Sequence, residues 1–203
     1  PEPPMRMQGL NQNGPTNMVA GNIYESLLRY NEKLEPQPSL AKSWEISPDA
    51  KVYTFKLQEG VTWHDGKPFT ADDVVFTWEY AADPATAAYT TGAYKDITVE
   101  KIDSHTVKVN FKAPTPFWAD PFVGVAGMII PKHHFGDYKG AKSREAPANL
   151  KPVGTGPYKF VDFKPGDIVL GTRNEDSHVK NKPQFDTLEV KGGCDAVSAA
   201  RAA

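Results

Sequence analysis

The stretch WHDGKPFTADDV, from Trp63 to Val74, holds residue types that are found in catalytic and metal sites. His64-Asp65 could supply two zinc ligands, or the base and the orienting carboxylate of a catalytic triad. Zinc needs a third protein ligand and a triad needs a nucleophile, and neither follows at a matching spacing. Asp65-Gly66 is also typical of a tight turn. We therefore interpret His64-Asp65 as part of the scaffold.

Asp72 and Asp73 form a second candidate pair, in this case for acid–base chemistry. Adjacent residues on a helix do not face each other, which argues against a catalytic dyad. Thr70 is a favourable N-cap, and carboxylates in the first turn stabilise the positive end of the helix dipole. We interpret both residues as the start of a helix.

His133-His134 could bind a metal ion, but adjacent side chains are expected to diverge, and no cysteine or carboxylate cluster follows. GTGPY, from Gly154 to Tyr158, lacks the lysine of a phosphate-binding loop and precedes an expected strand. Cys194 has only Lys191 nearby to lower its pKa. The sequence therefore predicts no catalytic residue, no metal site and no cofactor.

Hydrophobic periodicity predicts several strands around these candidates. Tyr53, Phe55 and Leu57 alternate with polar residues, which indicates a half-buried strand. ITVEKIDSHTVKVNF predicts a hairpin over 97–111, and a second hairpin is expected from 156 to 174. FDTLEVK, at 185–191, predicts a last strand.

Helices are predicted between the strands. The first runs over 17–31 with Thr16 or Asn17 as its cap, the second covers 71–83, and a third begins at Asp195. Residues 136–152 are polar and are expected to form an exposed connection. Strands mixed with helices and hairpins predict an α/β fold, in the mixed α+β sense.

The composition narrows the class of protein. With 39% hydrophobic and 24% charged residues, the 203-residue chain is typical of a globular domain. A net charge of −2 argues against a nucleic-acid partner. No apolar run approaches the ~20 residues that span a bilayer. The single cysteine excludes an intrachain disulfide.

The order of short motifs resembles the bacterial extracellular solute-binding proteins of the dipeptide/oligopeptide type, family 5. These are the ligand-capturing subunits of ABC importers. The motifs that carry the resemblance are ESLL (25–28), PSLAKSW (38–44), DAKVYTFKL (49–57), GVTWHDGKPFTADDV (60–74), APTPF (113–117), IIPKH (129–133) and GTGPY (154–158).

The resemblance implies a partial lobe of the type II periplasmic binding protein fold, with mixed sheets flanked by helices. Residues 1–24 and 151–203 would form part of the main subdomain of lobe I, and 25–150 its small extra subdomain. Lobe II is expected to be absent. The resemblance also implies a periplasmic protein, or one anchored outside the cell in a Gram-positive, that passes a peptide or related solute to permease subunits and is not an enzyme.

Three segments are expected to contact the ligand. They are the loop Gln12-Asn13-Gly14, the segment Tyr89-Thr90-Thr91 and the inter-subdomain crossover Val153-Gly154-Thr155. Plain turn formation is a near-equal explanation for the glycine-containing segments. The ligand itself stays open, because the family also includes binders of nickel, sugars and opines.

Two other functions remain as alternatives. The chain could be an interaction module that self-associates through exposed apolar surface. It could also be a hydrolase that uses carboxylates such as Asp65 or Asp72.

Overall fold

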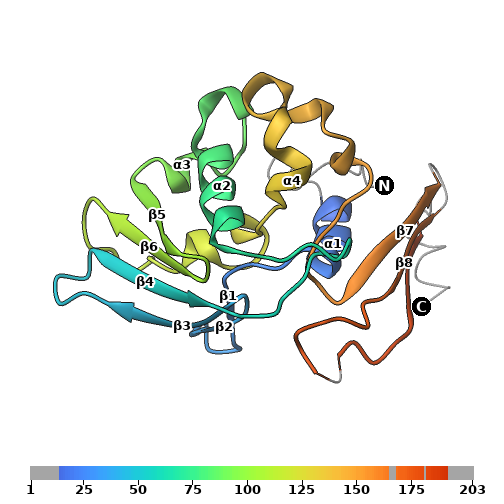
Figure 1. Cartoon of the computed structure of the whole chain (residues 1–203), viewed down its shortest axis with the longest axis horizontal. Coiled ribbons are helices and arrows are strands. Elements are labelled where there is room, and N and C mark those ends of the chain that lie inside the picture. Colours follow the sequence, from blue (N-terminus) through green and yellow to red (C-terminus); the bar gives the residue numbers. More distant parts are fainter. Residues whose placement is uncertain (1–13, 165–167, 181, 192–203) are drawn as a thin grey trace.

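The computed structural model describes residues 14–164, 168–180 and 182–191. Figure 1 shows two sheets at opposite ends of the molecule, with helix α1 (Gly14–Ile23) between them. The other α-helices are α2 (Ala71–Ala82), α3 (Thr91–Tyr94) and α4 (Lys132–Phe135). The strands are β1 (Leu28–Tyr30), β2 (Pro36–Pro38), β3 (Ala41–Ile46), β4 (Val52–Leu57), β5 (Ile97–Asp103), β6 (Thr106–Phe111), β7 (Tyr158–Lys164), β8 (Ile168–Arg173) and β9 (Thr187–Lys191). Short 3₁₀ helices are η2 (Pro84–Thr86), η3 (Asp120–Phe122), η4 (Gly124–Gly127), η5 (Gly136–Tyr138), η6 (Gly140–Glu145) and η7 (Pro147–Asn149).

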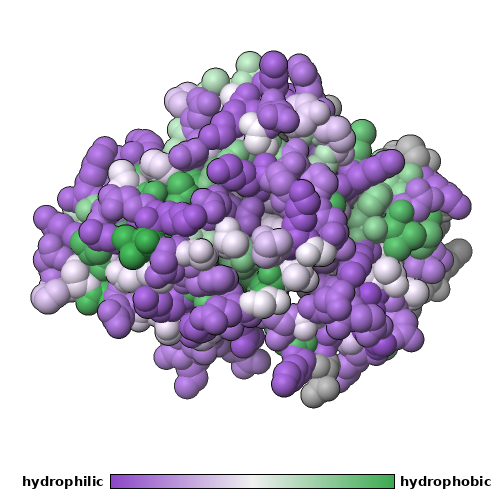
Figure 2. All heavy atoms as spheres, in the orientation of Figure 1, coloured by the Kyte–Doolittle hydropathy of each residue, from purple (hydrophilic) through white to green (hydrophobic). Residues whose placement is uncertain are grey.

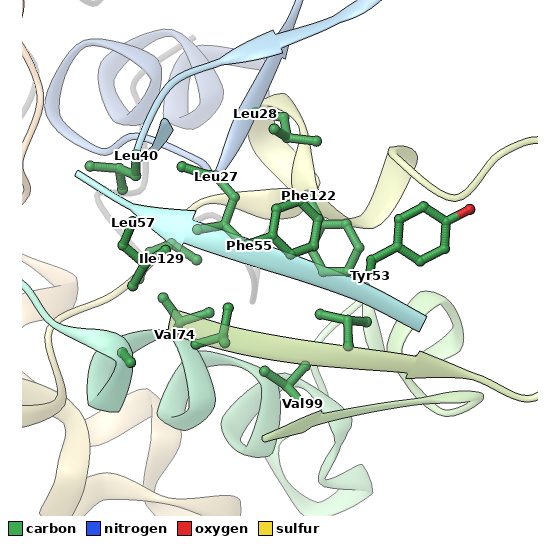
Figure 3. Close-up of a cluster of buried hydrophobic side chains, with 14 of the residues drawn as sticks. Leu27, Leu28, Leu40, Tyr53, Phe55, Leu57, Val74, Val99, Phe122 and Ile129 are labelled. Carbon is green, nitrogen blue, oxygen red and sulfur yellow. The ribbon is translucent and has the colours of Figure 1, made fainter. Parts of the chain in front are cut away.

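The larger sheet is antiparallel, with strand order β3-β4-β6-β5. Its buried face follows from the alternation along β4, because Tyr53 pairs with Val109 and Phe55 pairs with Val107. All four side chains are nearly fully buried. Figure 3 shows Phe55 and Leu57 gathered with Leu27 and Phe122 along β4. The half-buried strand and the hairpin over 97–111 are thus confirmed.

Helix α2 begins as predicted. Thr70 Oγ1 accepts a hydrogen bond from the Asp72 amide, and Asp73 Oδ2 accepts one from the Thr70 amide at 3.1 Å. This capping box satisfies amides that have no partner inside the helix. The helix ends at Ala82, next to Pro84.

The first helix differs from its prediction. It starts at Gly14 and ends at Ile23, whereas a helix over 17–31 was expected. Residues 28–30 instead pair antiparallel with 36–38 as β1 and β2. Leu27 and Leu28 are both fully buried, and Leu28 is the first residue of β1. Strand pairing here outweighs the local helical period.

The segment 136–152 was expected to be an exposed connection, and that expectation is only partly right: most of its residues are exposed, but it forms 3₁₀ helices that contribute buried residues to the fold. Its 3₁₀ helices bury Ser143 and Asn149, which are 2% and 4% exposed. Ser143 donates to the Thr86 carbonyl, and its own carbonyl accepts from Tyr80 and from Asn149. The polar residues are therefore paired inside the fold, as buried polar groups usually are.

The three-stranded sheet has the order β7-β8-β9 and is antiparallel throughout. The predicted second hairpin and last strand are confirmed, although the turn at 165–167 lies outside the described residues. Val169 of this sheet packs with Val19 and Ile23 of α1 in a second core. The helix expected from Asp195 also lies outside the described residues. Within the described part of the chain, no helix is both long and apolar enough to cross a membrane.

Candidate ligand-binding site

The crossover between the two parts of the chain, Val153–Gly156, lies against the C-terminal end of α1. The Gly156 amide donates to the Ile23 carbonyl at 2.8 Å. A Cβ atom on Gly154 would lie 1.9 Å from the Ile23 oxygen, and one on Gly156 would lie 2.6 Å from it. Both distances are shorter than any real contact, so glycine is required because the two backbones touch.

His64 holds the same crossover from the other side. Its Nδ1 accepts from the Gly154 amide at 3.2 Å, and its Nε2 donates to the Gly156 carbonyl at 2.9 Å. The His64 amide also donates to the Gly154 carbonyl. Burial lowers the pKa of His64, and the hydrogen bond to Gly156 opposes this only in part. The ring is therefore neutral at pH 7, as an acceptor at Nδ1 requires.

A carboxylate completes the junction. Glu25 Oε2 accepts from the Thr155 hydroxyl at 2.9 Å, and His178 Nε2 lies 3.0 Å from both Glu25 oxygens. The side chains of Glu25 and His178 are only 14% and 13% exposed. Glu25 thus connects the segment before β1, the crossover and the segment after β8. No local pattern predicted this cluster, because Thr155 and His178 lie 130 and 153 residues from Glu25.

The polar hollow after β8 reaches the same junction. Residues that line it include Asn174, Glu175 and Lys180. Asn174 is buried, and its amide Nδ2 donates to the Gly156 carbonyl at 3.1 Å. Asn174 thus lines the hollow and is hydrogen-bonded to the crossover.

The three segments predicted to contact ligand are not adjacent in the described structure. Gly14 is the first residue of α1, and Gln12 and Asn13 lie outside the described residues. Gly14 and Ile23 are nine positions apart, which places them about 13–14 Å apart along the helix axis. Gly14 and the crossover therefore lie at opposite ends of α1.

The segment Tyr89-Thr90-Thr91 lies at the start of α3, on the opposite side of α2 from α1 (Figure 1). Tyr89 is 36% exposed, whereas Thr90 is buried. The Thr91 hydroxyl lies 2.7 Å from the Ala88 carbonyl and 2.8 Å from the Ala81 carbonyl. In the crossover, Gly154 and Thr155 are also buried, and Val153 is half-buried.

The two adjacent histidines behave differently from expectation. His133 Nε2 lies 2.7 Å and His134 Nε2 lies 2.9 Å from the same Asp65 oxygen, Oδ2. The ring centroids are 4.5 Å apart, so the side chains converge rather than diverge. Burial of Asp65 raises its pKa, but the hydrogen bonds from both histidines and from the Lys67 amide outweigh it and lower the pKa to about 2.

Asp72 and Asp73 point to different partners. Asp72 forms an ion pair with Lys101 at 2.8 Å. Asp73 is 5% exposed and accepts from the amides of Thr70 and Lys132 and from Trp63 Nε1. Burial raises the pKa of Asp73. The two carboxylates are helix-start and core-linking residues, as the sequence predicted for a structural role.

Several solved structures share this fold. The oligopeptide-binding protein AppA of Bacillus subtilis, solved with a nonapeptide, matches with a TM-score of 0.84 and 29% identity over 92% of this chain and 37% of that chain. NikZ of Campylobacter jejuni, solved with Ni(L-His), matches with a TM-score of 0.81 and 34% identity over 90% of this chain and 36% of that chain.

The chain belongs to the bacterial extracellular solute-binding proteins, family 5: the profile described as the middle part of that family matches residues 35–203. A relative from Brucella ovis, named an ABC transporter peptide-binding protein, is 37% identical over 168 residues. That alignment covers 81% of this chain and 31% of the relative. The chain thus spans about a third of the relative's length. The family resemblance and the fold class predicted from sequence are confirmed.

Proposed function

We propose that this chain is the lobe I portion of the substrate-binding component of an ABC importer, which captures peptides or a related small solute between two lobes. The observation that carries the proposal is the crossover at 153–156. Two parts of the chain meet there, and His64, Glu25 and the end of α1 fix the backbone. A fixed junction of this kind suits a receptor whose second lobe closes on ligand around a hinge.

The separate sheets support the proposed division of lobe I into two subdomains. Residues 25–150 hold the four-stranded sheet with α2, α3 and α4, and residues 151–203 hold the three-stranded sheet. Residues 1–24 contribute α1 to the second group, because Val19 and Ile23 pack with Val169. Among the described strands, none of one sheet pairs with a strand of the other.

The ligand contacts fall to three segments: Gln12-Asn13-Gly14, Tyr89-Thr90-Thr91 and Val153-Gly154-Thr155. Tyr89 has the open surface that a ligand contact needs. Thr155 acts by holding the crossover, since its hydroxyl is bonded to Glu25. Relatives of this chain are named for peptides and for Ni(L-His), and peptides are the class we propose here.

The receptor acts by binding and not by catalysis. Of the carboxylates that a hydrolase would need, Asp65 is bonded to His133 and His134, and Asp72 to Lys101. Delivery of a captured solute requires permease subunits, so the receptor works in the periplasm, or outside a Gram-positive cell on a membrane anchor.

Native mass spectrometry of the purified chain is the first test. A peptide-sized mass that leaves on unfolding supports the proposal and yields the ligand for sequencing. If no such mass is found, the full receptor that carries this segment is titrated by calorimetry with di-, tri- and nonapeptides, which tests directly whether it binds peptides. Absence of binding by that receptor would overturn the peptide assignment.

A pair of substitutions tests the first ligand segment in the same receptor. Asn13→Ala removes a proposed hydrogen bond to the ligand, and we expect about ten-fold weaker peptide binding with unchanged melting. Asn110→Ala is the matched control, because the Asn110 amide bonds Thr98 and Glu100 on the solvent side of the sheet. Equal affinity of the two variants would count against the segment.

A self-associating module is the second candidate, favoured by one surface feature. Figure 2 shows hydrophobic side chains gathered over β7 and β8, and Val161 is 55% exposed. Exposed apolar surface of this kind often marks a surface that packs against another protein. A stable dimer of the chain in sedimentation, lost in Val161→Lys, would favour the module.

A further inference from the structure

Three side chains from two distant segments converge on one point of the surface. Asp65 Oδ2 receives the Nε2 atoms of His133 and His134 at 2.7 and 2.9 Å. One ligand atom from each residue lies within 4.8 Å of the others. Neutral imidazole nitrogens with a carboxylate form a common ligand set for zinc and its neighbours.

We propose that Asp65, His133 and His134 form a binding site for a divalent first-row transition-metal ion, with Zn²⁺ as the best-suited ion. Zn–N and Zn–O bonds of about 2.0–2.2 Å place tetrahedral ligand atoms about 3.3 Å apart. Binding therefore requires the Asp65 oxygen to withdraw from each histidine nitrogen by about 0.5 Å, and the two Nε2 atoms to lie about 3.3 Å from each other. The proton on each Nε2 moves to Nδ1, so that the Nε2 lone pair faces the metal.

The two segments that carry the ligands are held rigidly before any ion binds. Asp65 lies in a turn closed by the bond from the Trp63 amide to the Lys67 carbonyl at 2.8 Å, and Gly66 supplies the positive φ of 84°. The His133 ring packs edge-on against Trp63, with centroids 6.4 Å apart.

The other segment, α4, is anchored at both ends. The Lys132 amide donates to Asp73 Oδ1 at 3.0 Å. Phe135 is fully buried in the second core. Ligands on elements fixed in this way need little reorganisation on binding, which favours affinity.

The environment admits an ion from solvent. The side chains of His133, Asp65 and His134 are 22%, 30% and 35% exposed. A shallow hollow lined by His133, Thr70 and Asp137 opens beside them. Three protein ligands leave a fourth tetrahedral position, which water fills. The bound ion would join the turn at Asp65 to α4, 68 residues further along the chain.

The test is a Zn²⁺ titration of the tag-free, chelator-treated chain by calorimetry, with Cys194→Ser in every protein so that the thiol cannot bind. We expect one ion per chain and a Zn²⁺-dependent rise in melting temperature. Asp65→Asn, His133→Gln and His134→Gln should each weaken binding at least about ten-fold, because even loss of a supporting partner has that effect. Mg²⁺ and Ca²⁺ should not compete, because they prefer oxygen ligands.

His105→Gln is the matched control. It removes a histidine from the β5–β6 turn, and it should leave the Zn²⁺ affinity unchanged. Each variant is first melted with chelator present, so that a folding defect is distinguished from lost binding. His134→Gln keeps the His133–Asp65 contact and is therefore the least disruptive of the three.

Equal Zn²⁺ affinity in all four variants, or absence of stoichiometric binding to the parent chain, would overturn the proposal. The titration contains no peptide. Its outcome is therefore independent of whether the chain captures a solute.

Discussion

His64 and Gly154, 90 residues apart in the sequence, are joined by two reciprocal hydrogen bonds. The His64 amide donates to the Gly154 carbonyl at 2.9 Å, and the Gly154 amide donates to His64 Nδ1 at 3.2 Å. The second bond requires an unprotonated Nδ1, so protonation of the His64 ring would break this contact with the crossover. The connection between the two parts of the chain is therefore sensitive to pH.

The crossover should weaken in mild acid. Burial lowers the folded-state pKa of His64 below 6.5, so the unfolded chain binds the proton first. The stability contributed by neutral His64 is complete above pH 6.5 and is lost as pH falls below it. We expect unfolding free energy, measured in urea, to fall over this range more steeply in the parent chain than in His64→Gln. His105→Gln should retain the slope of the parent chain; a parent slope equal to that of His64→Gln would contradict the prediction.

Gly154→Ala should be strongly destabilising. The added Cβ would lie 1.9 Å from the Ile23 oxygen, a backbone atom that cannot move aside without shifting α1. We expect a loss of about 3 kcal/mol or more, at the upper end of overpacking effects. Gly92→Ala is the control, because its Cβ meets no atom within 4 Å and lies in helix α3. Its effect should be neutral or stabilising by up to about 1 kcal/mol. Chemical denaturation of both variants gives the comparison.

Asp73→Asn and Asp72→Asn should differ sharply, although the two residues are neighbours. Asp73 is buried and accepts three hydrogen bonds, and the side-chain amide of asparagine would set an NH₂ group against one or more of those donors. We expect a loss of about 2–4 kcal/mol for Asp73→Asn. The Asp72–Lys101 pair is exposed, so Asp72→Asn should cost less than about 1 kcal/mol. Similar losses for both variants would show that the hydrogen bonds of Asp73 contribute little.

Asp65 should govern stability in stronger acid. Its pKa is lowered to about 2 in the folded chain, from an ordinary value of 3.8. Because the folded pKa is depressed, the contribution is complete above about pH 4 and is lost as pH falls from there towards 2. After allowance for solvent screening it amounts to about 1–2 kcal/mol. Thermal melts between pH 2 and pH 5 should show a shallower pH dependence for Asp65→Asn than for the exposed-carboxylate control Asp137→Asn.

Elements whose signals are local were predictable from the sequence. The alternation of Tyr53, Phe55 and Leu57 defines β4, because side chains of a strand alternate between its faces. Thr70 marks the start of α2, and this signal is also local, because an N-cap side chain accepts from amides two or three residues further along the chain. The order of the family motifs also identified the fold class before any contact was known.

Contacts between segments that are distant in the sequence were determined only by the tertiary structure. The helix expected over 17–31 ends at Ile23 because 28–30 find partners at 36–38. The need for glycine at position 154 comes from the Ile23 carbonyl, which lies against it. Asp65 meets His133 and His134 because the turn after β4 and helix α4 are packed together through Trp63 and Asp73. Sequence periodicity reports the near neighbours of a residue along the chain, and it carries no record of which backbone or side chain folding later places beside it.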